Sequence, residues 1–465
     1  MGWRVTANAS VELRSIPSVR PRLLTTQTVR VLVYIAQMIL DIAAIVGGFT
    51  IAALIRHRSL QWGADMMALV TLLPVFMVIS FYAGAYNYDG VGKREGVNRA
   101  LTSLALAIAF NILAAFALKN DGEISRIFLF AGAALAAMLL IVVRLTMVYL
   151  INNHLKSGFI RRVLVIDDAP IAVPPGFEVI DVADYGVTPC PNDPHALHMI
   201  SSLLFGADRV AVSSSPEKRE NWSLYLKGIG CNGEMLVPEL HAIGQLHAAD
   251  GTTMVGVPVS AGPLNIRARV LKRSFDLLLT VPTIIALTPV FILIAIAIKV
   301  TDPGPVLFRQ RRMGRGNRLF NVYKFRSMRV EASDHTGARS ASRDDDRITP
   351  IGRIIRKTSL DELPQLFNVL EGDMSLVGPR PHALGSLAGD ELFWHVDRRY
   401  WLRHAIKPGI TGLAQVRGFR GATDHRDDLM QRLVCDLEYA ADWSILGDLI
   451  ILARTVAVLV HKKAY

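Results

Sequence analysis

Long apolar runs separated by short polar segments fill the first third of the chain. Four of these runs reach the roughly 17 to 25 residues that a transmembrane helix needs. They are Val31 to Ile55, Met66 to Ala85, Ala100 to Leu118 and Ile127 to Val143. The pattern therefore predicts a cytoplasmic N-terminal segment at residues 1–30, followed by a four-helix transmembrane bundle at residues 31–150.

Basic residues lie at alternate ends of these runs: before the first, between the second and third, and after the fourth. Cytoplasmic loops of membrane proteins carry an excess of lysine and arginine. Both ends of the bundle are therefore expected on the cytoplasmic side, although Arg56 and Arg58 oppose this orientation.

One charged residue, Asp41, lies within the first apolar run. A charge at the centre of a transmembrane helix costs about 2.5–3.5 kcal/mol on insertion scales. Its carboxylate is therefore expected to face the bundle or a lipid headgroup rather than acyl chains. A packing role inside the bundle is the interpretation that we favour.

Short β-branched runs replace the long apolar ones after the bundle. VLVID (Val163 to Asp167) and RVAVSSS (Arg209 to Ser215) predict strands, and the stretches before Arg209 and after Glu220 predict helices. This alternation predicts a Rossmann-like α/β domain at residues 160–263. The turn after VLVID reads DAPIAVPPG and lacks the G-x-G-x-x-G glycines that cradle a pyrophosphate. We therefore expect a degenerate domain without a dinucleotide, which serves dimerisation, regulation or neither.

The next apolar run, Leu277 to Ile298, is long enough to cross the membrane but contains Pro282 and Pro289. A proline inside a helix removes a backbone hydrogen bond and costs about 3 kcal/mol or more, which favours a break at Thr288-Pro289. Basic residues flank both ends of the run, so both ends are expected in the cytoplasm. The sequence thus predicts a re-entrant helix at residues 274–300 rather than a straight fifth span.

This helix is expected to belong to an α-rich C-terminal domain at residues 268–465. FRQRRMGRGNR (Phe308 to Arg318) and FWHVDRRYWLRH (Phe393 to His404) mix arginines with aromatic residues, which is typical of segments on an anionic membrane surface. Solvated charged faces are the alternative. Asp448 and Arg454 interrupt the apolar run from Ser444 to Val460, which predicts an amphipathic helix that lies on the membrane or packs on the domain.

Composition supports a membrane protein with anionic partners. Hydrophobic residues make up 51% of the 465 residues, too many for an ordinary soluble protein, and the formal net charge is +11. Lipid headgroups and phosphorylated substrates are therefore expected partners. Nucleic acid is not expected, because the basic residues cluster beside apolar segments. Three scattered cysteines show neither disulfide nor metal spacing.

Two adjacent acids precede a proline in the stretch TSLDELPQLFNVLEGDMSLVGPRP. Ser359 and Glu362 have capping-box spacing, but that helix would place Pro364 in its first turns. We therefore predict that the helix starts at Pro364 and ends before Gly372. Asp361 and Glu362 would then lie at the helix mouth, where backbone N–H groups attract phosphate. One carboxylate could attack a substrate while the other holds a metal ion.

Cationic side chains occur in small groups around these acids. YKFRSM places Lys324 and Arg326 at alternating positions, which in a strand project to one face. GRIIRKTS supplies Arg353 and Arg356, and VGPRP holds Arg380 between two prolines. Arginines in fixed positions suit bidentate phosphate contacts. Carboxylates, a divalent cation and several arginines are what phosphoryl transfer requires, so these cations are predicted to bind substrate phosphates.

Five motifs, in order along the chain, carry a family resemblance. They are KRSFDLLL (Lys272 to Leu279), DPGPVLFRQRRMG (Asp302 to Gly314), YKFRSM, TSLDELPQLFNVLEGDMSLVGPRP and KPGITGLAQV (Lys407 to Val416). In these motifs the chain resembles the bacterial sugar transferases, or polyprenyl-phosphate phosphoglycosyl transferases, over about residues 271–465. Its N-terminal organisation is similar to that of the long members that start exopolysaccharide repeat units.

The resemblance implies transfer of a sugar 1-phosphate, with glucose favoured, from a UDP-sugar to undecaprenyl phosphate, with release of UMP. It implies that Asp361 is the nucleophile that forms a sugar-phosphoryl aspartate and that Glu362 holds Mg²⁺, the expected cofactor. It also implies the helix break at Thr288 and Pro289. The expected location is the bacterial inner membrane, with the catalytic domain facing the cytoplasm and contacting membrane lipids.

The resemblance further implies a donor loop, with Gly409, Thr411, Gly412 and Gln415 as its contacts. Arg417 follows GITGLAQV where relatives often carry asparagine, so the identity of the sugar stays open, with UDP-galactose or another UDP-hexose as alternatives.

A hydrolase that passes sugar phosphate to water and a non-catalytic polyprenyl-phosphate-binding scaffold are rival functions. A homodimer is one expected assembly. The histidines of the catalytic half, His382, His395, His404 and His425, show no ligand spacing and are expected at the surface or an interface.

Overall fold

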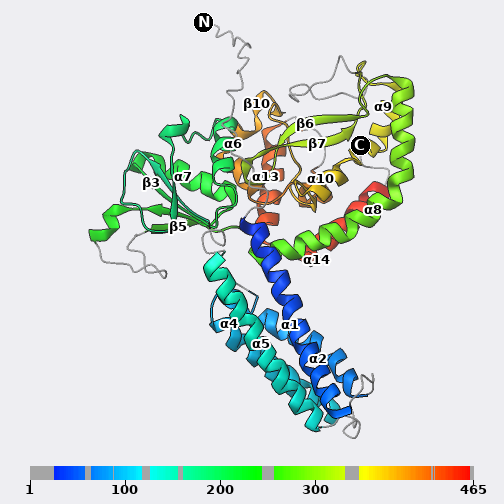
Figure 1. Cartoon of the computed structure of the whole chain (residues 1–465). Coiled ribbons are helices and arrows are strands. Elements are labelled where there is room, and N and C mark those ends of the chain that lie inside the picture. The colour runs from blue at the N-terminus through cyan, green and yellow to red at the C-terminus, as the bar shows by residue number, and fades with distance from the viewer. Residues whose placement is uncertain are drawn as a thin grey trace. The chain divides into compact units, whose positions relative to one another are not determined.

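The computed structural model describes residues 26–57, 64–86, 88–117, 126–154, 161–242, 256–329, 345–419, 423 and 425–460. The chain divides into two compact units, with the boundary between Arg161 and Arg162. The first is a helical bundle, and the second contains a mixed α/β domain and a C-terminal domain (Figure 1).

The bundle contains four apolar helices and one short helix. These are α1 (Thr26–His57), α2 (Ala64–Tyr82), α3 (Tyr88–Val91), α4 (Glu95–Ala117) and α5 (Arg126–His154). By length and composition α1, α4 and α5 could each cross a membrane, whereas the apolar part of α2, Leu69–Tyr82, is shorter than a full span. Their core includes Ile45, Phe49, Phe76, Phe128 and Leu140. A membrane protein with an N-terminal helical region is thus supported.

The charge inside the first helix faces the bundle, as predicted. Asp41 is fully buried and forms an ion pair with Arg144 of α5 at 2.5 Å. Gln37 and the Tyr86 hydroxyl donate to the same carboxylate at 2.7 and 3.0 Å. Helix α5 continues past Val143, where the predicted run ended, and the paired Arg144 lies within it.

The α/β domain is built on a five-stranded sheet of order β2-β1-β3-β4-β5. Its strands are β1 (Arg162–Asp167), β2 (Phe177–Asp181), β3 (Arg209–Ser214), β4 (Gly233–Leu236) and β5 (Gly256–Ser260). Only the β4–β5 pairing is antiparallel. The helices are α6 (Pro194–Leu203) and α7 (Pro216–Ile229), with the short turns η1 (Ala183–Tyr185) and η2 (Pro238–Ala242). The strands predicted from VLVID and RVAVSSS are therefore present in a mixed α/β domain.

Side chains of the same domain contact the carboxyl end of β1. Asp167 accepts hydrogen bonds from Lys218 at 2.7 Å and from the Trp222 indole at 2.8 Å. In open α/β sheets ligands bind beyond the carboxyl ends of the strands. Here the Asp167 carboxylate at that position already has two donors from α7.

The C-terminal domain begins with the long helix α8 (Ile266–Thr301) and the hairpin of β6 (Leu307–Met313) and β7 (Leu319–Phe325). The other helices are α9 (Pro350–Lys357), α10 (Gln365–Glu371), α11 (Phe393–Val396), α12 (Leu413–Val416), α13 (Arg426–Ala441) and α14 (Ile445–Val460). Short 3₁₀ turns are η3 (Arg315–Asn317), η5 (Leu360–Glu362) and η6 (Arg398–Ala405). Two small sheets join β8 (Ser375–Val377) to β11 (Gly409–Thr411) and β9 (Leu387–Ala388) to β10 (Glu391–Leu392).

Helix α8 bends rather than breaks. It is assigned as one helix from Ile266 to Thr301, with Pro282 and Pro289 inside it, and its ribbon changes direction along its length (Figure 1). Prolines are a common cause of such bends. The Thr288 hydroxyl also donates to the Ile284 carbonyl at 2.9 Å, a contact that often bends helices. The structure thus describes a bend in one continuous helix, and the re-entrant path with a break at Thr288-Pro289 stays a prediction.

The aromatic segment from Phe393 to His404 does not lie on a surface, contrary to expectation. Trp394, Tyr400 and Trp401 belong to one hydrophobic core with Trp222 of α7. The Trp401 indole donates to the Pro191 carbonyl of the α/β domain at 2.8 Å. The mixture of arginines and aromatic residues predicted a membrane-surface segment, but these rings are buried between the α/β domain and the C-terminal domain, and Arg398 and Arg399 remain exposed.

Candidate active site

The two adjacent acids lie in the 3₁₀ turn η5, which connects α9 to α10. Ser359 enters this turn with φ of 57°, in the left-handed region, and makes no side-chain cap. Pro364 directly precedes α10, and Gly372 caps its end with φ of 98°. The predicted helix bounds are thus confirmed to within one residue, and the capping-box alternative does not form.

Glu362 is held by two cations. Lys324 Nζ donates to Oε1 at 2.9 Å, and Arg380 donates to Oε1 at 2.6 Å and to Oε2 at 3.3 Å. Burial alone would raise the pKa of the Glu362 carboxyl, but Arg380 and Lys324 lower that pKa well below its usual range. Glu362 is therefore ionised at any physiological pH.

Asp361 has different surroundings, although it is the neighbouring residue. No donor within the described part of the chain hydrogen-bonds to its carboxylate, and burial raises its pKa while Lys324 opposes the increase. A carboxylate that is desolvated and without hydrogen-bond donors is more basic and more nucleophilic than one bound by two cations. The two acids therefore suit different roles.

The backbone that follows the Arg380 side chain is fixed by two further arginines. Arg403 donates to the Arg380 carbonyl at 2.7 Å, and Arg312 donates to the Pro381 carbonyl. Arg403 is itself paired with Asp436 of α13 at 2.7 Å. No local sequence pattern indicates these positioning arginines, because their partners lie tens of residues away along the chain.

Not all of the predicted phosphate-binding cations gather around the acids. Arg356 lies close enough to Asp361 to lower its pKa, whereas Arg353 is exposed on α9. Arg326 is buried and donates to the Asp302 carbonyl at the end of α8. Strand β7 ends at Phe325, so the alternation that placed Arg326 beside Lys324 no longer applies.

The predicted donor loop packs closely against the VGPRP segment. A Cβ on Gly409 would lie 2.1 Å from the Gly378 nitrogen, and one on Gly412 would lie 2.3 Å from the Gly378 carbonyl oxygen. These two glycines are therefore required for backbone packing. Thr411 hydrogen-bonds to Thr455 of α14 at 2.7 Å, and the buried Gln415 Oε1 has no partner within the described residues.

A cavity of about 270 Å³ lies beside Glu362. The loop contributes Thr411 and Gln415 to its lining, and the bent helix α8 contributes Thr283 and Leu287. The cavity therefore joins a charged carboxylate, an unsatisfied amide oxygen and the apolar helix. Such a lining suits a ligand with both polar and apolar parts.

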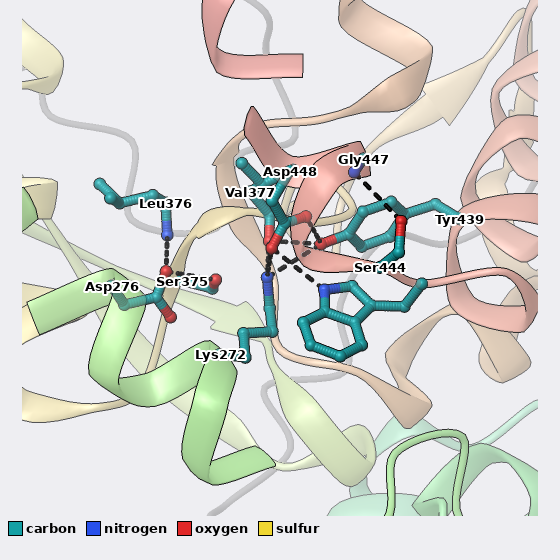
Figure 2. Close-up of polar contacts among 10 residues, drawn as sticks. Lys272, Asp276, Ser375, Leu376, Val377, Tyr439, Ser444, Gly447 and Asp448 are labelled. Atoms are coloured by element: carbon teal, nitrogen blue, oxygen red, sulfur yellow. Dashed lines mark hydrogen bonds and ion pairs between the residues drawn. The ribbon is translucent and has the colours of Figure 1, made fainter. Parts of the chain in front are cut away.

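A buried network, also missed from the sequence, fixes α8 to the rest of the domain (Figure 2). Lys272 of α8 forms an ion pair with Asp448 of α14 at 2.7 Å and donates to the Val377 carbonyl and the Tyr439 hydroxyl. Asp276, one turn further along, accepts from the Ser375 hydroxyl at 2.9 Å and from the Leu376 amide at 3.1 Å. Helix α14 is thus packed on the domain through Asp448, as one predicted alternative proposed.

The described residues include no group of three or more His, Cys, Asp or Glu side chains placed to hold a metal ion. Among the residues that the structure describes, only Arg380 donates to Oε2 of Glu362, at 3.3 Å. Mg²⁺ commonly binds through one or two carboxylates together with substrate phosphates. The acidic pair therefore fits a Mg²⁺ shared with a substrate diphosphate, but not an all-protein metal site.

Two of the four histidines are buried, contrary to expectation. His382 Nδ1 accepts a hydrogen bond from Arg403 at 2.5 Å and lies 3.1 Å from the Tyr400 hydroxyl oxygen. Burial and the nearby Arg403 lower the pKa of both His382 and His404 well below the usual range, so both are neutral. His395 and His425 are exposed, as predicted.

Comparisons with known proteins agree with the motif analysis. The model of the family described as bacterial sugar transferase matches residues 267–462. An undecaprenyl-phosphate glucose phosphotransferase of Komagataeibacter xylinus is 54% identical over 185 residues, which are 40% of this chain and 35% of that protein. A UDP-glucose:undecaprenyl-phosphate glucose-1-phosphate transferase of Escherichia coli is 43% identical over 235 residues, 50% of each chain.

A third relative is matched over nearly its whole length. The exopolysaccharide production protein PSS of Rhizobium leguminosarum bv. phaseoli is 47% identical over 197 residues, which are 42% of this chain and 98% of that protein. The chain spans only about a third to a half of the length of the other two relatives. The family resemblance is nevertheless confirmed by the match over 98% of PSS, and the chain belongs to the bacterial sugar transferase family.

Proposed function

We propose that this chain transfers glucose 1-phosphate from UDP-glucose to undecaprenyl phosphate, which releases UMP and yields undecaprenyl-diphosphate-glucose. The names of the relatives in K. xylinus and E. coli support glucose and undecaprenyl phosphate as substrates. The observation that carries the proposal is the contrast between Glu362, held by Lys324 and Arg380, and its neighbour Asp361, which has no donor in the described residues. The reaction would be the first membrane step of exopolysaccharide or capsule repeat-unit synthesis.

The first step is attack by an Asp361 carboxylate oxygen on the phosphorus that carries the sugar. The bond from this phosphorus to the bridging oxygen breaks, and UMP leaves with the electron pair. The product is a sugar-phosphoryl aspartate, a mixed anhydride that retains the transfer potential of the diphosphate. Lys324 and Arg380, which lie at Glu362, stabilise the negative charge that develops on the phosphate oxygens.

In the second step a phosphate oxygen of undecaprenyl phosphate attacks the same phosphorus and releases the Asp361 carboxylate. One diphosphate linkage replaces another, so the overall exchange is close to thermoneutral. The apolar helix α8 contributes Thr283 and Leu287 to the cavity beside Glu362. A lipid phosphate can thus reach the site from the membrane side.

Mg²⁺ shared by Glu362 and the donor diphosphate would neutralise charge on the phosphate oxygens. In this arrangement Arg356 and Arg380 complete the phosphate contacts. Gln415 Oε1, which has no partner within the described residues, accepts a hydrogen bond from the UDP-sugar. Arg326 and Arg353, which lie apart from the acids, have structural or surface roles instead.

We also propose an inner-membrane location with the C-terminal domain in the cytoplasm. The basic residues at both ends of α8 support a re-entrant path, and the bend within α8 allows one (Figure 1). A homodimer stays a prediction.

The test is UMP release by the full-length protein in detergent with Mg²⁺, using UDP-glucose, UDP-galactose and other UDP-sugars, with and without undecaprenyl phosphate. Release should require the lipid and UDP-glucose, and Asp361→Asn should reduce it by at least about 10³-fold, since nucleophile removal typically costs more than this. Asp390→Asn, a change to an exposed acid of the same domain, is the matched control. Lipid-independent UMP release would instead support a hydrolase, and no release from any donor would support a scaffold.

A further inference from the structure

A second, smaller cavity lies at the start of α8. It measures about 80 Å³ and shares no lining residue with the cavity beside Glu362. Its walls come from the linker that follows β5, from the first turns of α8, from η3 and from the segment that precedes β11. The cavity therefore lies where the α/β domain joins the C-terminal domain.

Positive charge dominates the walls of this cavity. Five cations line it, against one carboxylate, Asp276: Arg269, Lys272, Arg273, Arg315 and Lys407. Lys272 is neutralised by Asp448, and Asp276 already accepts from Ser375 and Leu376 (Figure 2). Four cations therefore remain against the one lining carboxylate, Asp276, and the charges of Asp276 and the nearby Asp373 only partly offset the effect of burial and of neighbouring cations on Lys407.

Two of these four have their polar atoms engaged and two do not. Arg273 donates to the carbonyls of Val369 and Leu370 at the end of α10, and Arg269 donates to the Leu264 carbonyl. Carbonyl oxygens satisfy hydrogen bonds but do not neutralise charge. Arg315 and Lys407 have no hydrogen-bond acceptor within the described part of the chain.

This arrangement is unfavourable without a bound anion. Burial, together with the nearby Arg273 and Arg315, lowers the pKa of Lys407 to about 8. Burial and Arg269 lower the pKa of Arg315 to about 9. Desolvated cations that repel one another gain most from a multivalent anion that accepts hydrogen bonds from several of them.

We propose that this cavity binds a phosphate group, with Arg315 and Lys407 as its principal ligands and Arg269 and Arg273 as supporting charges. The volume of about 80 Å³ admits one such group, whereas drug-sized ligands occupy about 300–1,000 Å³. The group belongs either to free phosphate or to a lipid headgroup, since α8 is also an apolar helix.

The position of Lys407 connects this site to the proposed active site. Ala405, Ile406 and Lys407 line the small cavity, and Ile410 and Thr411, a few residues later, line the cavity beside Glu362. The intervening Gly409 packs against Gly378 with no room for a Cβ. A bound phosphate at Lys407 therefore fixes one end of the predicted donor loop.

Chemical labelling of Lys407 tests this site without any reading of enzyme activity. The full-length protein in detergent is treated briefly with acetic anhydride near pH 8, and acetylation of each lysine is measured by mass spectrometry with increasing inorganic phosphate. Phosphate should reduce labelling of Lys407 at least fivefold, because it covers the amine and favours the protonated form. Lys227, an exposed lysine on α7, is the internal control and should not respond.

Arg315→Gln should abolish the protection of Lys407 by phosphate, while Lys407 itself remains available for labelling. Lys357→Gln, which changes an exposed cation of α9, should leave the protection intact. The same labelling in lipid nanodiscs, in a buffer without inorganic phosphate, distinguishes a lipid headgroup from free phosphate as the ligand. Protection in phosphatidylglycerol but not phosphatidylcholine identifies a lipid headgroup, and protection by inorganic phosphate alone identifies free phosphate. Lys407 labelling that responds to neither would overturn the proposal, whatever the activity assay shows.

Discussion

Asp361 and Glu362 are adjacent residues whose charges have opposite effects on stability. Burial raises the pKa of Asp361, so at neutral pH its charge destabilises the folded protein. The pKa of Glu362 is lowered by Arg380 and Lys324 despite burial. The stability that Glu362 contributes is therefore present above its unfolded pKa and is lost as the pH falls through its much lower folded value.

This contrast predicts different stabilities for two inactive variants. Asp361→Asn should unfold at the same temperature as the wild type or higher, because it removes the unfavourable charge of a partly buried carboxylate. Glu362→Gln should lose about 1.5–3 kcal/mol, because two cations lose a charged acceptor. Thermal unfolding in detergent at pH 7 measures both, with Glu371→Gln, an exposed acid of α10, as the control. Equal destabilisation by both variants would contradict the assigned difference.

At the scale of helices and strands, the features that depend on neighbouring residues could be predicted from the sequence, and the contacts between residues far apart in the chain could not. Pro364 and Gly372 act through their own backbone geometry, so the bounds of α10 followed from the sequence. The contact between Lys272 and Asp448 joins residues 176 positions apart, and no local pattern encodes it. The burial of Trp394 and Trp401 likewise depends on the α/β domain that covers them. The acidic pair was found because both acids and the helix that follows them occupy one short stretch.

The attachment of α14 to α8 is expected to depend on the Lys272–Asp448 pair. Both side chains are almost fully buried, and Asp448 also accepts from Tyr439 and Trp443. Removing one partner of a buried ion pair costs about 3–5 kcal/mol, because the other charge is left uncompensated. Lys272→Met should therefore lower the unfolding temperature and expose α14 to limited proteolysis.

A double variant separates charge from packing. In Lys272→Met with Asp448→Asn no charge remains. The amide oxygen can accept from Trp443 in place of Oδ2, and the amide nitrogen can donate to the Tyr439 hydroxyl, which still donates to the Val377 carbonyl. The double variant should recover most of the stability lost in Lys272→Met. Additive losses from the two single changes would show that the pair does not interact as a unit.

At the scale of the whole molecule, the exposure of α8 indicates where lipid is needed. Only 11% of its most apolar window is buried in the protein, against 22–39% for α1, α4 and α5. Leu278 and Ile285 are 72% and 69% exposed. A helix this apolar and this uncovered requires a membrane, but its exposure is the same for a straight span and for a re-entrant hairpin.

A straight span and a re-entrant hairpin therefore differ in the sides of the membrane on which the two ends of α8 lie. Single cysteines at Ala261 and Pro303, before and after α8, are introduced into a Cys190→Ser background and treated with an impermeant maleimide in spheroplasts. A re-entrant helix predicts that neither is labelled until the membrane is permeabilised, because both ends are cytoplasmic. Ala117→Cys, at the end of α4, should be labelled from outside and so confirms access. Labelling of Pro303→Cys from outside would establish a straight span, which would place the acids of η5 on the side opposite to cytosolic UDP-sugars.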